Sequence, residues 1–138
     1  MKYLAITLML SLLYTATVCA QDAEHIEEAQ NSAIKWLALI DTGQHPESWD
    51  HAAELFRSSI GKSEWQKTIF SVRETFGAVK HRKLKTSTYT KTLPGAPDGE
   101  YVVLQFDTRF ENKSRAIETV TPMREKDGSW KVSGYYIK

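Results

Sequence analysis

The chain has 138 residues, with 18 Lys and Arg against 17 Asp and Glu and a formal charge of +1. This length predicts one domain with its own core, and four Trp, six Tyr and five Phe exclude a disordered chain. The balanced charge gives no overall attraction to nucleic acid or anionic lipid, so we predict no nucleic-acid partner.

Residues 1–20 have the successive parts of a secretory signal peptide. Lys2 gives a positive start, the apolar stretch 3–17 is shorter than the roughly 20 residues of a membrane span, and small residues precede a cut after Ala20. We therefore expect an exported protein, periplasmic or secreted, with no stable membrane span and a single mature domain over residues 21–138. The alternative is a lipoprotein acylated at Cys19, although the residues before this cysteine match that signal poorly.

Three helices are predicted in the first half of the mature chain. Apolar residues over 26–40 recur at three- and four-residue steps, which is typical of an amphipathic helix. A shorter helix over 46–56 has Pro in its first turn, where proline is tolerated. A third helix is expected over 63–76, with Ser63 and Gln66 forming a capping box at its start.

Four strands are predicted in the second half, where the apolar period becomes two. They cover 80–93, 102–110, 117–124 and 130–137, and the first is polar enough to be an edge strand. The Pro- and Gly-rich stretch 94–99 cannot continue a strand and predicts a hairpin loop. Strands joined by hairpins indicate an antiparallel sheet and exclude a doubly wound parallel one.

The fold class that follows is α+β, with three N-terminal helices packed on a curved antiparallel sheet of about four strands. We considered two architectures, a nuclear-transport-factor-like cone and a flatter cystatin-like sheet wrapped on one helix. Three helices before the sheet favour the cone.

Several local patterns occur along the mature chain and are distinctive when taken together. They are Trp36-Leu37 with Asp41 and Gly43, Ser48-Trp49, Phe56, Trp65, Pro94-Gly95-Ala96-Pro97-Asp98-Gly99-Glu100-Tyr101, Glu118-Thr119-Val120-Thr121-Pro122, Trp130 and Gly134-Tyr135-Tyr136-Ile137. Together they resemble a family of small exported bacterial proteins that is catalogued only as a domain of unknown function, number four thousand and nineteen. The resemblance implies a bacterial cell envelope and brings no catalytic residues with it.

The sequence lacks the usual signatures of catalysis and of cofactor binding. The four histidines are not spaced to share a metal ion on one helix, and we expect His25 to be exposed near a helix end. A nucleophile elbow, a Walker loop and a dinucleotide glycine motif are absent, so no catalytic residue, metal or cofactor is predicted. The basic run 80–85 is better explained as charge that protects an edge strand than as a nucleic-acid or anion site.

Aromatic side chains with polar tips are the best candidates for a ligand site, because they combine an apolar body with a hydrogen-bonding group. Alternation places Tyr135 and Tyr136 on opposite faces of their strand, so one of them should face outward. Glu118 alternates with Val120 and is expected to point partly inward. The candidate ligand-binding residues are Trp49, Tyr101, Glu118, Trp130, Tyr135 and Tyr136.

Two functions fit these patterns. The first is a non-enzymatic envelope protein that binds a small apolar ligand or another envelope protein through the mouth of the cone. The alternative is a small cone-fold hydrolase or isomerase that uses a carboxylate in the cavity, for which a buried Glu118 bonded to a tyrosine would be supporting evidence. Monomer and homodimer are both open.

Overall fold

The computed structural model describes the backbone of residues 2–138 and the side chains from Val18 onward. Four helices precede four strands: α1 (Lys2–Asp41), α2 (His45–Asp50), α3 (Glu54–Ser59), α4 (Lys62–Phe76), β1 (Val79–Thr90), β2 (Tyr101–Phe110), β3 (Ala116–Arg124) and β4 (Trp130–Ile137). The strands form one antiparallel sheet in the order β1-β2-β3-β4. The predicted α+β class is confirmed, and the strand limits differ from the prediction by three residues at most.

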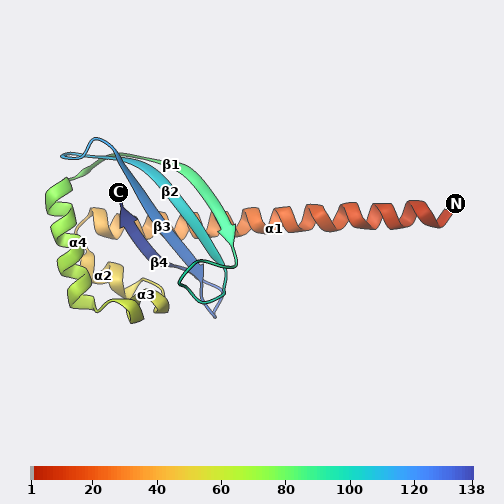
Figure 1. Cartoon of the computed structure of the whole chain (residues 1–138), viewed down its shortest axis with the longest axis horizontal. Coiled ribbons are helices and arrows are strands. Elements are labelled where there is room, and N and C mark those ends of the chain that lie inside the picture. The colour runs from red at the N-terminus through yellow and green to blue at the C-terminus, as the bar shows by residue number, and fades with distance from the viewer. Residues whose placement is uncertain (1) are drawn as a thin grey trace.

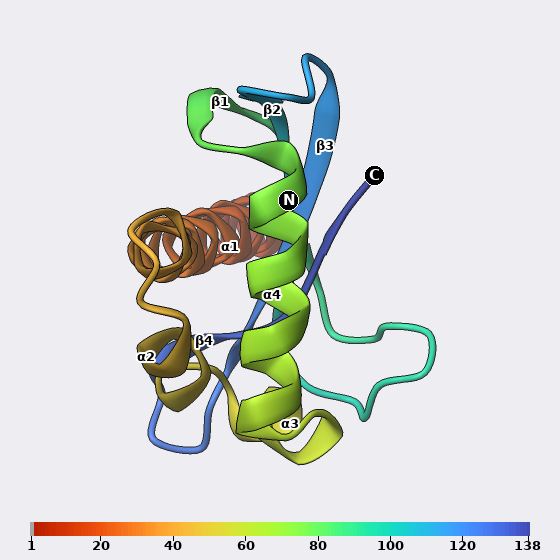
Figure 2. The ribbon, with the colours of Figure 1, turned by 90° about the vertical axis from the view of Figure 1, so that its left-hand side faces the viewer.

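The helices lie on one side of the curved sheet, and the other side is left open (Figures 1 and 2). The second half of α1 packs across the sheet, while its first half projects away from the domain. The hydrophobic core joins this helix to α3, α4 and the inner face of β2, β3 and β4. Its buried members include Trp36, Leu37, Phe56, Trp65, Leu104, Phe106, Val120 and Val132.

The predicted second helix is wrong in one respect, because the structure divides it into α2 and α3. The division is at Ala53, whose backbone is extended with φ −61° and ψ 154°. Its N–H donates a 2.8 Å hydrogen bond to the carbonyl of Val132 on β4. The edge strand β4 thus accepts a hydrogen bond from an N–H that a continuous helix would have used internally. Local sequence cannot reveal this tertiary contact.

The start of α4 also differs from the prediction. Gly61 occupies the N-cap position, and no side chain caps the helix, so the Ser63–Gln66 capping box does not form. The helix ends at Phe76, and Gly77 follows it as the C-cap residue with a φ of 75°. A Cβ at Gly77 would lie 2.8 Å from Cβ of Glu111, so only glycine fits the close turn from α4 into the sheet.

The register of the β3–β4 pairing shifts between Thr121 and Pro122. Thr121 pairs with Gly134, whereas Pro122 pairs with Val132, so β4 has one extra residue at this point. Proline has no N–H to donate, which explains why the irregularity occurs beside it. The extra residue in β4 allows Val132 and Tyr135 to face the helices together although they are three positions apart. As predicted, Tyr136 faces the other way and is 56% exposed.

Candidate functional site

The side chain of Glu118 on β3 lies on the face of the sheet that the helices cover, and it has no exposed surface. Arg82 donates to both of its oxygens, from Nε to Oε1 at 2.7 Å and from Nη2 to Oε2 at 3.2 Å. The hydroxyl of Thr108 donates to Oε1 and the phenol of Tyr135 donates to Oε2, each at 2.5 Å. The predicted inward orientation of Glu118 is confirmed, and its burial is complete.

A second carboxylate joins the two arginines from the other side. Asp41 accepts a 2.7 Å hydrogen bond from Nη2 of Arg73 and a 2.6 Å bond from Nη1 of Arg82. Arg73 also lies 3.9 Å from Oε2 of Glu118. Two negative and two positive groups therefore alternate, and their formal charges cancel. We call the whole set the Glu118 network: Asp41, Arg73, Arg82, Thr108, Glu118 and Tyr135.

Each member of the Glu118 network comes from a different element. In chain order the contributors are α1, α4, β1, β2, β3 and β4. Two of the positions follow from alternation along a strand, since Arg82 and Thr108 share the inner face of their strands with Leu84 and Phe106. Tyr135 shares that face with Val132 only because of the extra residue in β4. The network therefore links the two long helices to all four strands.

Burial and charge shift the pKa values of these groups. Burial alone would raise the pKa of Asp41, but hydrogen bonds and charge from Arg82 and Arg73 outweigh it and lower that pKa. Burial alone would lower the pKa of Arg82, but the hydrogen bonds and charges of Asp41 and Glu118 outweigh burial and raise that pKa above its usual value. Burial, the charge of Glu118 and its hydrogen bond together raise the pKa of Tyr135 well above its usual value. Each shift favours the protonation state that the network requires.

This arrangement leaves Glu118 no free position from which to act as a base. A carboxylate accepts about four hydrogen bonds, and Glu118 already accepts two on each oxygen. A surface groove of about 580 Å³ is lined by Asp41 and Arg73, so solvent reaches the outer end of the network only. The chemistry of the network is consequently that of a buried ion-pair cluster that orders the fold.

A second buried polar cluster surrounds His25. Only 6% of His25 is exposed, which corrects the prediction that it is a surface residue. Its ring stacks on Tyr89 at 5.6 Å between centroids and tilts against Trp130 at 5.8 Å. Its Nε2 lies 3.6 Å from Oε1 of Glu100, and the indole of Trp130 donates to Glu28 at 3.1 Å. The histidine is buried because α1 passes directly over the end of the sheet, which periodicity did not show.

The structure separates most of the candidate residues from one another. Of the six, it brings together only Glu118 and Tyr135. Trp130 belongs to the His25 cluster, and Trp49 donates to the carbonyl of Ile60 at 2.8 Å.

The other two candidates occupy the opposite side of the sheet. Tyr101 is fully buried, because the loop before β2 covers it and the carbonyl of Pro97 accepts its hydroxyl at 2.6 Å. Tyr136 stands exposed on the open face. The six residues therefore do not line one cavity.

Sequence reasoning missed four members of the Glu118 network, namely Asp41, Arg73, Arg82 and Thr108. Asp41 and Arg73 belong to helix faces whose partners depend on tertiary packing. The inward orientation of Arg82 could have been predicted, because Arg82 alternates with Leu84 and so shares the inner face of β1. Its membership of a basic run concealed that signal.

Within residues 18–138, no group of three His, Cys, Asp or Glu side chains is placed to hold a metal ion. In the part of the chain that the structure describes, no helix combines the length and apolarity needed to cross a membrane.

The fold and this network define an α+β domain with helices on one face of an open antiparallel sheet. The chain belongs to the family described as "Protein of unknown function (DUF4019)", whose model matches residues 32–135. A solved structure from Catenulispora Acidiphila, described only as a 2.5 Angstrom structure, has the same fold with a TM-score of 0.57. It is 13% identical, and the match covers 86% of this chain and 93% of that one. A search of curated proteins finds no match.

Proposed function

We propose that this protein is an exported, non-enzymatic domain of the bacterial envelope that binds a small ligand on the open face of its sheet. The observation that carries the proposal is a hollow of about 470 Å³ on that face, lined by residues of β1, β2, β3 and the β2–β3 loop and by Lys138. Volumes of about 300–1,000 Å³ are usual for small-molecule sites. The aromatics predicted to line the mouth of the cone do not line one cavity, so we place the ligand site on the open face instead.

The path of the backbone over residues 2–20 supports the export part of the proposal. In Figure 1 this half of α1 extends away from the domain, and Val18 is 51% exposed. Among the side chains that the structure describes, the first buried one in α1 is His25. A cut after Ala20 would therefore leave the packed part of the helix in place.

The test of ligand binding is a nuclear magnetic resonance screen of neutral and charged fragments against the chain as processed and purified from a bacterial host. We expect binding to shift the backbone amides of 107–109, 115–117 and 138. Shifts confined to the groove beside Asp41 and Arg73, or no shifts with any fragment, would overturn the proposal. Capture of an envelope protein on the same face without any fragment binding would replace the ligand by a protein partner.

One observation favours the enzymatic alternative, because Glu118 is buried and hydrogen-bonded to Tyr135. An isomerase or hydrolase of this kind needs the carboxylate to exchange a proton with substrate. Here that exchange would first require Arg82, Thr108 or Tyr135 to break its hydrogen bond to a carboxylate oxygen of Glu118. Tyr135→Phe frees one acceptor position while retaining the ring, so an enzyme should change its rate in this variant, whereas a binding domain should keep its fragment affinity.

A further inference from the structure

The hollow on the open face lies at the end of the sheet where β1 begins and β2 ends. His81 and Arg109 are paired across these two strands. Lys138 joins them because its backbone exchanges two hydrogen bonds with Ile117, at 2.9 and 3.1 Å. The complete lining is His81, Asp107, Thr108, Arg109, Ser114, Arg115, Ala116, Ile117 and Lys138.

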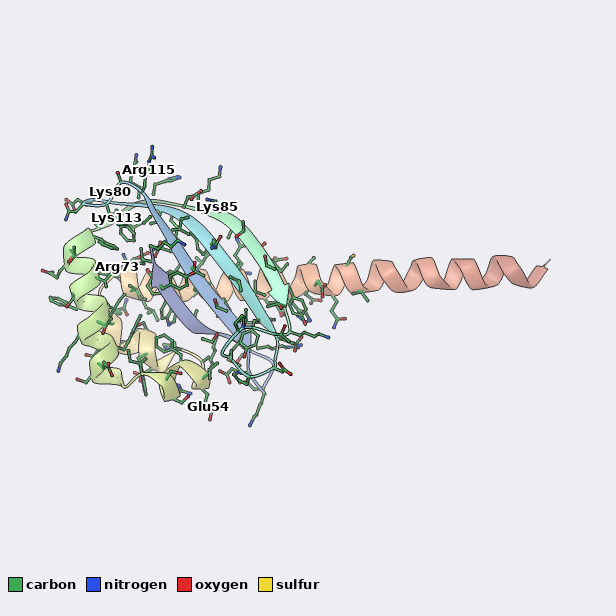
Figure 3. All side chains as sticks on the ribbon, in the orientation of Figure 1. Glu54, Arg73, Lys80, Lys85, Lys113 and Arg115 are labelled. Carbon is green, nitrogen blue, oxygen red and sulfur yellow. The ribbon has the colours of Figure 1, made fainter. Side chains whose placement is uncertain are left out.

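Positive charge dominates this hollow. Arg109, Arg115 and Lys138 are exposed, and none of them makes an ion pair in the described part of the chain. Asp107 is the one acidic side chain in the lining, and Lys85 holds it at 3.6 Å. Lys80, Lys113 and Arg115 are at the same end of the molecule (Figure 3), which strengthens the local positive potential.

Protection of an edge strand does not explain this arrangement. That explanation accounts for lysines along β1, which is an edge of the sheet. Arg109, however, is on β2, an inner strand, and Arg115 is in the loop between β2 and β3, two inner strands. The whole chain carries a formal charge of only +1, so the concentration of unpaired cations around one concavity is a local property.

We propose that this hollow binds the phosphoryl group of a small phosphate ester, either free or as a lipid headgroup. Guanidinium groups bind phosphate through two parallel hydrogen bonds, and Arg109 and Arg115 offer two such groups. Lys138 supplies a point charge and Ser114 a hydroxyl donor. Ala116 and the half-buried Ile117 provide apolar surface for the carbon part of the ester.

The test is calorimetric titration of the processed chain with glycerol 3-phosphate, with glycerol as the uncharged control. The variant Arg109→Gln with Arg115→Gln should weaken binding at least about tenfold, since each lost charged hydrogen bond is worth about that much. The control pair Lys67→Gln with Lys126→Gln removes the same charge from exposed positions elsewhere and should bind as the unmodified chain does. Unchanged circular dichroism will establish that both double variants fold.

Vesicles distinguish the two sources of the phosphate ester. Binding to phosphatidylglycerol but not phosphatidylcholine vesicles, lost in the arginine variant, supports the headgroup; binding to glycerol 3-phosphate alone supports the free ester. No binding to any of these phosphates, or equal loss in the control pair, overturns the inference. Because it rests on the proposed function, the fragment screen separates the two failures: neutral fragments that still bind the hollow would leave the proposed function standing without its phosphate specificity.

Discussion

The phenol of Tyr135 on β4 donates a 2.5 Å hydrogen bond to Oε2 of Glu118 on β3. The acceptor has no exposed surface, so its charge must be balanced from within the protein by Arg82 and, more distantly, Arg73. The same two arginines bind Asp41 at the end of α1. Through these two arginines the buried charge of Glu118 is linked to α1 and α4.

Replacing this carboxylate tests its role directly. Glu118→Gln keeps the side-chain shape but leaves two arginines facing one carboxylate in a buried site. Removal of one partner from a buried ion pair costs about 3–5 kcal/mol, so we expect a loss of that size in the free energy of unfolding. Urea denaturation will measure it, with the exposed Glu27→Gln as control. A loss below about 1 kcal/mol would show that the network does not stabilise the fold.

Tyr135 predicts a specific response to alkaline pH. Its pKa is raised above 10.0, so the folded protein retains a proton that the unfolded chain releases. The stabilisation is complete below pH 10 and is lost as the pH rises toward the higher folded pKa. Tyr89, whose pKa is raised to about 12, acts in the same direction. In Tyr135→Phe the free energy of unfolding should therefore fall less steeply above pH 10 than in the unmodified protein.

Urea denaturation across that pH range, with tyrosinate absorbance as a second signal, measures the slope. Tyr136→Phe is the matched control, because this neighbouring phenol is 56% exposed. If both variants give the same slope, the phenol of Tyr135 is not the group responsible.

Asp41 predicts a loss of stability at acidic pH. Its pKa is lowered below 3.8, so its stabilisation is present above that pH and is lost as the pH falls through the folded pKa. Asp41→Asn should cost about 1–2 kcal/mol at neutral pH, because this carboxylate is only partly buried, and should flatten the acid limb. Acid titration followed by circular dichroism measures this, with the exposed Asp98→Asn as control. An acid limb as steep as that of the unmodified protein would contradict it.

Much of the fold could be predicted because it depends on local periodicity. The strand limits follow from alternation, and the amphipathic pattern over 26–40 marks the packed part of α1. The break between α2 and α3 could not be predicted, since it depends on a hydrogen bond from Ala53 to a strand almost 80 residues later. Local sequence carries no record of such a contact.

The site was predictable only in part, for a related reason. Alternation predicted that Glu118 points partly inward and that Tyr135 and Tyr136 lie on opposite faces, and the structure brings Glu118 and Tyr135 together. Asp41 and Arg73 come from helices whose rotation against the sheet is fixed by packing. The hollow around Arg109 and Arg115 depends on strand register, which a single sequence does not specify.

Ser48 offers a test of the packing between α2 and α4. It is fully buried, and its hydroxyl accepts the indole N–H of Trp65 at 2.9 Å while donating to the carbonyl of His45 at 2.7 Å. Ser48→Ala leaves the indole N–H without its partner in the core, which should cost about 1–3 kcal/mol. The exposed Ser58→Ala should change stability by less than about 0.5 kcal/mol. Tryptophan fluorescence during urea unfolding reports both, and equal effects would contradict the assigned role.

The position of His25 predicts how many N-terminal residues can be removed without destabilising the domain. A chain that begins at Gln21 retains every buried side chain described in α1, so its free energy of unfolding should equal that of the full chain. A chain that begins at Ile26 loses the imidazole between Tyr89 and Trp130 and should be less stable by about 1–3 kcal/mol. His25→Ala in the chain from Gln21 separates loss of the ring from shortening of the helix. If removal of residues 1–20 already destabilises the domain, that segment is part of the folded structure and the proposed cut after Ala20 is wrong.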